Sequence, residues 1–223
     1  MSIFSVFRSG DVVQIFATVL SRIFIVFFCL PIHETAHAWA ADKMGDHTAR
    51  NFGRLTLNPF THLDLFGTIM IFLFGIGYAK PVPVRERNFK NPKKGIAVTA
   101  LAGPASNILM GFIAICLYYA SLLLGKSTGM QFLQLFLYLA AYINVTLAVF
   151  NLIPIPPLDG SKVLAMLIPA KYYFKYMQYE RYVMIALMAL LFTGILSTPI
   201  SFISQFVMNV ISFIPRLIYG VLS

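Results

Sequence analysis

Long apolar runs dominate this sequence and decide what the chain can fold into. Four of them, at about 12–41, 95–124, 130–153 and 182–222, are long enough for helices that cross a bilayer. Of the 223 residues, 59% are hydrophobic and only 11% are charged, whereas an average soluble domain is about 25% charged. A globule of this length has too little interior to hide that much apolar surface from water. The composition therefore excludes a soluble enzyme, a disordered chain and a disulfide-stapled secreted domain.

These runs predict an all-α polytopic membrane protein. We expect one domain over residues 1–223, with a bundle of about five or six membrane segments and a short re-entrant or extended insert after the first helix. The first run is expected to be a retained membrane helix rather than a signal peptide, because it is long and Arg22 interrupts it. The last run is broken near Pro199 and predicts either one kinked helix or a hairpin of two. The net charge of +9 is explained better by the positive-inside effect than by nucleic-acid binding.

The segment His33-Glu34-Thr35-Ala36-His37 carries the strongest chemical signal. Histidines four residues apart lie on one face of a helix, about one turn apart, so both imidazoles can reach one metal ion. Glu34 lies beside that face and can act on a water molecule at the metal. This is the H-E-x-x-H pattern of zinc hydrolases, with two ligands and a general base. The pattern also occurs by chance in soluble helices, but in a membrane helix these three residues would be costly unless paired or bound.

A catalytic zinc site takes three protein ligands and leaves one position open, so a third ligand has to come from elsewhere. Only eight residues of the chain are acidic, and apart from Glu34 and Asp159 they lie in polar or end segments. Asp159 follows a long apolar run; prolines break the helix just before it, and Gly160 permits a tight turn after it. Taken alone, Asp159 is typical of an interfacial helix cap. Together with the two histidines it is the best third ligand.

Three motifs, in this order, resemble those of the site-2 protease family of intramembrane metalloproteases, in a minimal form without a PDZ domain. They are the H-E-x-x-H segment, Gly103-Pro104-Ala105-Ser106-Asn107, and the proline-rich run from Asn151 to Gly160. The match spans about 32–162. The third motif reads Pro-Pro-Leu-Asp-Gly where many relatives have Asn-Pro-Leu-Asp-Gly, a departure that leaves Asp159 in place.

The resemblance implies a zinc-dependent intramembrane endopeptidase with a catalytic core at about 12–165. Its substrate would be a transmembrane segment of another protein in the lipid bilayer of the cell membrane, cut near the cytoplasmic face in regulated intramembrane proteolysis. Asn151 or Asn144 would hold the substrate backbone or the oxyanion, and the alternative for both is an interhelical hydrogen bond. One catalytic Zn2+ would be held by His33, His37 and Asp159, with Glu34 activating water.

A helical peptide bond is shielded from attack, so a transmembrane substrate has to unwind to an extended form. The stretch 78–84 is rich in proline and is itself predicted to be extended. From its composition and the family resemblance, we expect Val82 and Val84 to offer an edge along which a substrate strand pairs. The alternative is an ordinary rigid loop.

The apolar piece at 65–78 constrains the topology. It has 14 residues and three glycines, against about 20 residues for a spanning helix. If it crossed the membrane, the histidines and Asp159 would approach from opposite faces and one zinc ion could not join them, so we expect it not to span. Thirteen Lys and Arg residues then lie on the active-site face and two on the other before the C-terminal part, which predicts a cytoplasmic active site. The thirteen are Lys43, Arg50, Arg54, Lys80, Arg85, Arg87, Lys90, Lys93, Lys94, Lys162, Lys171, Lys175 and Arg181, and the two are Arg8 and Lys126.

Two other functions stay open. A metal-binding membrane transporter could use the same histidines, although such proteins usually show repeat symmetry and this chain does not. A catalytically inactive scaffold of the same family is the other alternative, and the intact set of ligands and base argues against it. His47 and His62 are expected to be interfacial histidines without a metal of their own.

Overall fold

The structure is a computed structural model, and it describes residues 6–8, 10–74, 79–125, 127–164, 166–169 and 178–222. Within these ranges the chain is helical and forms no strand, as the composition predicts. Four residues of the topology and strand-docking predictions lie outside the described residues: Tyr78, Lys126, Lys171 and Lys175.

Among the described residues, four helical stretches are long and apolar enough to cross a membrane: Val12–Lys43, α6 (Pro92–Leu122), α7 (Thr128–Asn151) and α11 (Ser197–Leu222). The first consists of α2 (Val12–Phe24), the π-helical turn η1 (Ile25–Cys29) and α3 (Leu30–Lys43). Two further apolar helices are shorter, α5 (Leu65–Phe74) with 10 residues and α10 (Glu180–Thr193) with 14. The predicted five or six segments therefore correspond to four helices of spanning length and two shorter ones. The short elements are α4 (Thr48–Asn51), η2 (Pro59–Thr61), η3 (Glu86–Asn88) and α8 (Asp159–Leu164).

Polar residues mark where the long helices begin and end. Asp11, Asn91 and Ser127 are the N-caps of α2, α6 and α7, and each side-chain oxygen accepts a hydrogen bond from the main-chain N–H three residues later. Gly194, with φ of +75°, ends α10. The C-terminal run is therefore two helices separated by a turn.

The first span changes its hydrogen bonding just before the histidines. The N–H of Leu30 donates to the carbonyl of Ile25, five residues back, which closes the π-helical turn. Pro31 follows directly and has no N–H to donate. The widened turn lets the chain pass this proline without ending the span, so α3 continues in helical geometry through His33 and His37.

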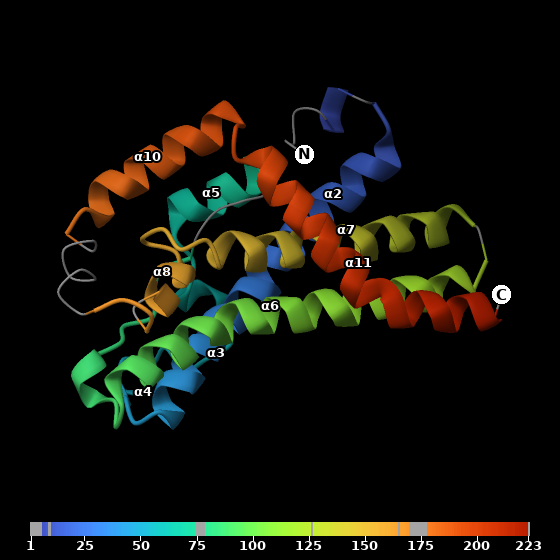
Figure 1. Ribbon diagram of the computed structural model, residues 1–223. Helices are drawn as coiled ribbons and strands as arrows, with labels where there is room; N and C mark the ends of the chain where they lie inside the picture. The colour runs from blue at the N-terminus through green and yellow to red at the C-terminus, as the bar shows by residue number, and fades with distance from the viewer. Residues whose placement is uncertain are drawn as a thin grey trace.

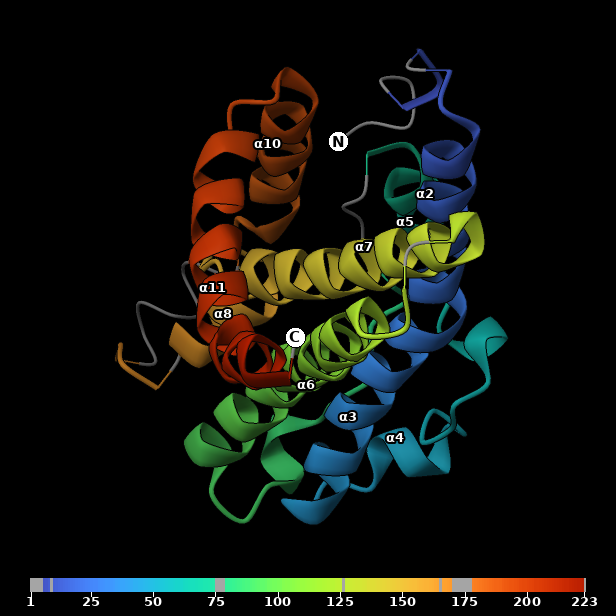
Figure 2. The same cartoon turned by 90° about the vertical axis from the view of Figure 1, so that its right-hand side faces the viewer.

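The long helices form three layers, which Figures 1 and 2 show from two sides. α6 and α7 lie side by side in the middle, the first span packs along one side of them, and α11 packs along the other. Small residues at the centre, among them Ala114, Ala140 and Ala141, are buried and permit this close approach.

The insert between α3 and α6 begins and ends in one place. Fully buried Asp46, just after α3, accepts hydrogen bonds from Arg85 N–H at 2.7 Å and from Asn88 Nδ2 at 2.8 Å, just before α6. The chain therefore returns to the side it left, and α5 does not carry it across as a single span. The buried guanidinium of Arg22 in α2 donates to the carbonyl of Phe72 and holds this short helix against the first span. The structure agrees with the predicted non-spanning insert.

Candidate metal centre

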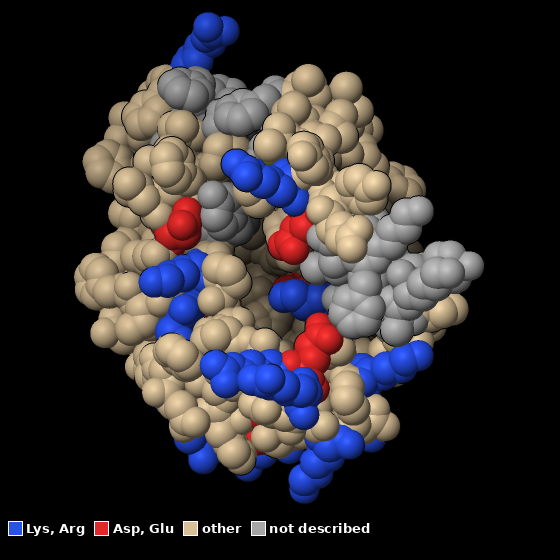
Figure 3. All heavy atoms as spheres, turned by 90° about the vertical axis from the view of Figure 1, so that its left-hand side faces the viewer, with Lys and Arg blue, Asp and Glu red and all other residues tan. Residues whose placement is uncertain are grey.

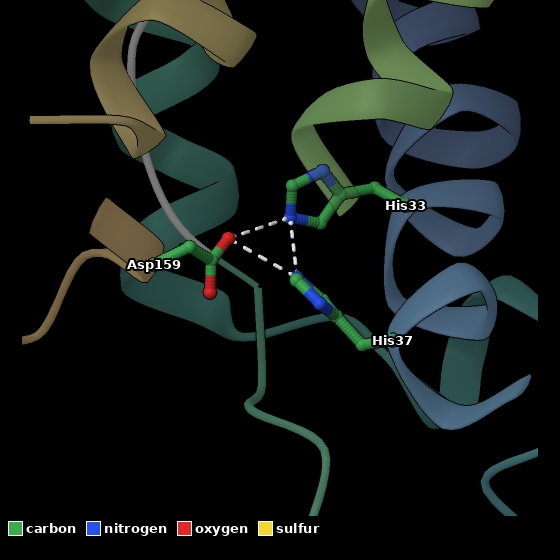
Figure 4. A group of neighbouring side chains, drawn as sticks. All are labelled: His33, His37 and Asp159. Atoms are coloured by element: carbon green, nitrogen blue, oxygen red, sulfur yellow. Dashed lines mark hydrogen bonds and ion pairs between the residues drawn. The ribbon is translucent and has the colours of Figure 1, made fainter. Parts of the chain in front are cut away.

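Two histidines and one aspartate converge inside the bundle. In Figure 4 the rings of His33 and His37 project from α3 toward the carboxylate of Asp159 at the start of α8. Asp159 Oδ2 lies 3.4 Å from His33 Nε2 and 3.1 Å from His37 Nε2, and the two Nε2 atoms are 3.0 Å apart. All three side chains are buried. The structure thus brings together the three residues that the sequence predicts as metal ligands.

Helix α6 fixes the histidine pair from the other side. His37 Nδ1 donates to the main-chain carbonyl of Thr99 at 2.7 Å, which leaves Nε2 as the lone-pair nitrogen. Gly103, one turn further along α6, lies directly against both rings. A Cβ atom there would be 2.3 Å from His37 Nε2 and 2.6 Å from His33 Cε1. A glycine at this position is therefore what allows α6 to approach so closely.

Asp159 is held in place by the turn that follows α7. A Cβ atom on the next residue, Gly160, would lie 2.2 Å from the carbonyl oxygen of Leu152, so glycine is required for this close turn. The second carboxylate oxygen of Asp159 lies 3.6 Å from the ammonium of Lys162, whose side chain reaches solvent. Burial alone would raise the pKa of Asp159, but the facing imidazoles of His37 and His33 outweigh it and keep the pKa well below its ordinary value.

This donor set fits a zinc ion. One ligand atom from each of the three residues lies within 4.8 Å of the others, and two imidazoles with one carboxylate are a ligand set of catalytic zinc. Such sites keep a fourth position for water. The hydrogen bond from His37 to Thr99 is the outer contact that usually orients a ligating histidine.

Glu34 is buried beside the ligands, and among the described residues nothing forms a hydrogen bond or ion pair with its side chain. Its charge acts on two residues of the insert, Arg54 and His62, whose pKa values are both lowered by burial. His62 is buried rather than exposed at an interface. Both residues also hold Lys80: Arg54 Nη2 donates to its carbonyl at 2.5 Å, and the Lys80 N–H donates to the carbonyl of His62 at 2.7 Å. The charge of the candidate base thus acts on the residues that anchor the segment beginning at Lys80.

The comparisons with known proteins agree with this geometry. The sequence profile of "Peptidase family M50" matches residues 21–130 and 121–194. The chain belongs to peptidase family M50, the site-2 protease family. YwhC of Bacillus subtilis is 43% identical over 169 residues, which cover 73% of this chain and 75% of that protein. Rip2 of Mycolicibacterium smegmatis is 32% identical over 59% of this chain and 51% of its own length, and MJ0611 of Methanocaldococcus jannaschii is 32% identical over 45% and 49%. All three carry the name "putative zinc metalloprotease". No solved structure gives a significant match.

This M50 protein is hollowed on the side that carries α4 and α8 in Figure 1. Figure 3 shows the hollow, with Lys, Arg, Asp and Glu side chains gathered around its mouth. Charged groups around this hollow are what a helical membrane bundle with this face in water requires.

The four residues predicted to contact substrate lie in α7 and in the segment before η3. Asn144 is buried, and its amide donates to Cys29 Sγ at 3.3 Å and to the carbonyl of Ala140 in its own helix. The contact with Cys29 is an interhelical hydrogen bond, which is the predicted alternative to a substrate role. Asn151 ends α7 and donates to the carbonyl of Leu147. Val82 and Val84 lie half-buried in a segment that is neither helix nor strand, and no residue that the structure describes forms a hydrogen bond with their main chain.

The sequence patterns did not reveal Thr99 and Arg54. Thr99 acts through a main-chain carbonyl, which any residue type would supply. Arg54 is one of many positive charges in the insert and carries no motif of its own. The one available signal for α6 was the spacing of Thr99, Gly103 and Asn107, which puts all three on one helix face.

Proposed function

We propose that this protein is a zinc-dependent intramembrane endopeptidase that cuts a transmembrane segment of another membrane protein near the cytoplasmic face, in regulated intramembrane proteolysis. The observation that carries the proposal is the buried cluster of His33, His37 and Asp159 within a helical membrane bundle, with Glu34 beside it. Membership of family M50 supports it. The core at about 12–165 would carry the chemistry.

The residues divide the work of peptide hydrolysis. When bound, zinc would polarise the scissile carbonyl and lower the pKa of water toward 7. Glu34 has no competing partner for its carboxylate among the described residues, so it is available to take the proton of the attacking water and to return it to the leaving amine. His37 is kept in one orientation by Thr99, and Asp159 by the tight turn at Gly160.

Substrate would bind along the extended segment next to the site. Among the described residues, nothing forms a hydrogen bond with the main chain of Val82 or Val84, which supports strand pairing there. Asn151 would contact the unwound backbone or the oxyanion. Lys80, at the start of the segment, is fixed by Arg54 and His62, and the charge of Glu34 acts on both of these residues. These contacts support the proposal that the segment presents a strand to the candidate base.

Replacement of Glu34 tests the enzyme. Wild type and Glu34→Gln would be purified, their zinc content measured, and cleavage of a single-span substrate compared, with Glu180→Gln in α10 as the matched control. We expect equal zinc in all three and cleavage at least about 100-fold slower only in Glu34→Gln. Cleavage retained in Glu34→Gln would defeat the proposal. Zinc binding without wild-type cleavage, but with zinc flux into vesicles, would favour the transporter, and zinc without either activity the scaffold.

The membrane side has its own test. Single cysteines at Arg50 and Lys90, near the two ends of the insert, would be labelled with an impermeant thiol reagent in intact cells and in inverted vesicles. We expect both to be labelled only from the cytoplasmic side, because Asp46 joins the two ends of the insert. Labelling of the two from opposite sides would refute the topology.

A further inference from the structure

Asn107 is the most conspicuous polar group that the proposed mechanism does not use. It lies in α6 with none of its surface exposed, and neither Oδ1 nor Nδ2 has a hydrogen-bond partner within the described part of the chain. A buried amide without partners costs about 1–3 kcal/mol for each unsatisfied group. Such a group calls for an explanation, and a missing partner at a ligand site is one.

His33 also has a buried polar atom without a hydrogen-bond partner among the described residues. Its Nδ1 is buried and has no partner among the described residues, whereas Nδ1 of His37 donates to the carbonyl of Thr99. If Nε2 of His33 binds a metal ion, the neutral ring carries its proton on Nδ1. Ligating histidines almost always donate that N–H to an acceptor. One of the two histidines thus has its outer contact and the other lacks it.

The register of α3 against α6 places Asn107 near His33. His37, later on α3, is paired with Thr99, which is early on α6, and Gly103 one turn later touches both rings. The helices therefore run in opposite directions here, so His33, one turn earlier on α3, faces a later turn of α6. Asn107 is on the same face of α6 as Thr99 and Gly103. Helical side chains lean toward the N-terminus, which brings the Asn107 amide over the turn where Gly103 has no side chain.

We propose that Asn107 is the positioning residue of His33: its amide oxygen accepts the Nδ1–H of His33 when a metal ion occupies the site. Thr99 and Asn107, one turn before and one turn after Gly103, then orient one ligand each. This inference rests on the zinc site of the proposed function but not on proteolysis. It gives Asn107 of the second motif a role at the metal rather than in helix packing alone.

Zinc affinity of the purified full-length protein tests the proposal. Competition with a chelator would be measured for wild type, for Asn107→Leu, which removes the acceptor, and for Asn107→Asp, which keeps one. We expect zinc to bind about 10–100-fold more weakly to Asn107→Leu and with near wild-type affinity to Asn107→Asp. The matched control is Asn144→Leu, the same change at a buried asparagine that contacts Cys29, and its zinc affinity should stay within about threefold of wild type.

The thermal stability of the metal-free protein separates positioning from packing. Asn107→Leu removes an unsatisfied buried amide, so its metal-free melting temperature should equal or exceed that of wild type while its zinc affinity falls. A packing residue would lower both. Wild-type zinc affinity in Asn107→Leu, or in Asn107→Ala if the leucine variant does not fold, would overturn the inference and leave the proposed protease intact. A wild-type protein that binds no zinc would overturn both.

Discussion

The helices around the candidate metal ligands, namely the first span, α6, α7 and α8 (the first region), differ from α11 in what they bury. In the most apolar 18-residue stretch of the first span and of α7, half of the residues are buried, against 11% in the same length of α11. The first region also encloses polar side chains: His33, Glu34, His37, Asn107, Asn144 and Asp159. α11 buries a single narrow stripe, Ile200, Ser204, Met208 and Pro215. Buried polar side chains are thus concentrated in the first region, whereas α11 buries little beyond its stripe.

The difference has a physical origin. Lipid is as apolar as a leucine side chain, so a membrane helix gains little from burying apolar surface and associates mainly through close packing and polar contacts. The first region has both, with Gly103 against two imidazoles and Asn144 against Cys29. α11 instead exposes large side chains such as Phe202, Phe206 and Phe213. We therefore expect substitutions in the first region to affect metal and catalysis, and those in α11 to affect only stability.

The largest contrast is expected between two glycine-to-alanine changes. At Gly103 a Cβ atom would lie 2.3 Å from His37 Nε2, so Gly103→Ala has to displace the ligands or the helix, a strain of about 1–3 kcal/mol. We expect zinc binding to weaken at least tenfold and proteolysis to be lost, as measured by metal content after dialysis and by substrate cleavage.

The matched control for that change is Gly220→Ala in α11, where nothing lies within 4 Å of the new Cβ atom. Alanine is a better helix former than glycine, so this variant should match wild type in zinc content and cleavage. If both variants retain zinc, the tight contact of α6 with the histidines is not needed for metal binding. The expected difference between the first region and α11 would then be wrong.

A smaller effect is expected at the edge of the first region, where the main chain of Val82 and Val84 has no hydrogen-bond partner within the part of the chain that the structure describes. Replacing both with proline removes two N–H donors and should slow cleavage about tenfold or more, while zinc content stays unchanged. Replacing both with threonine keeps the donors and is the control. Cleavage at the wild-type rate in the double-proline variant would mean that the segment is an ordinary loop.

Next in size is a pair of changes within α11. Met208 is 3% exposed and Phe206 is 64% exposed. Met208→Ala should lower the stability of the detergent-solubilised protein by about 2 kcal/mol, the lower end for a buried methionine, and Phe206→Ala should change it little. Zinc affinity per folded molecule should be the same in both. Loss of zinc in Met208→Ala would show that α11 supports the metal site and would blur the division between the regions.

Sequence alone could predict those parts of the molecule that depend on local spacing. The i and i+4 histidines, the rarity of acidic residues in apolar runs and the short piece after residue 65 together predicted the three residues that the structure brings together and the non-spanning insert. The supporting contacts could not be predicted because they depend on how helices cross. Thr99 contributes only a carbonyl, and Asn144 meets Cys29 across 115 residues of sequence. The C-terminal ambiguity was resolved by one turn at Gly194.

The smallest effect concerns Asp46, which lies outside the membrane spans and closes the insert. Burial alone would raise its pKa, but hydrogen bonds from Thr48, Arg85 and Asn88 outweigh burial and hold the pKa below its ordinary value of 3.8. A lowered pKa in the folded state means that the carboxylate stabilises the fold fully above pH 3.8, and that this contribution is lost as the pH falls through the folded pKa. At neutral pH, Asp46→Asn should therefore be less stable than wild type by about 1.5 kcal/mol.

That difference should shrink as the pH falls below 3.8, because wild type then loses its carboxylate as well. Unfolding of both proteins in detergent, followed by circular dichroism at several pH values, measures it, and the protonation of the metal ligands cancels in the comparison. A difference that stays constant down to the lowest pH would mean that Asp46 acts through its shape and not its charge. Packing would then hold the insert in place, as packing holds α11 against the bundle. The two regions would be more alike than their buried polar groups suggest.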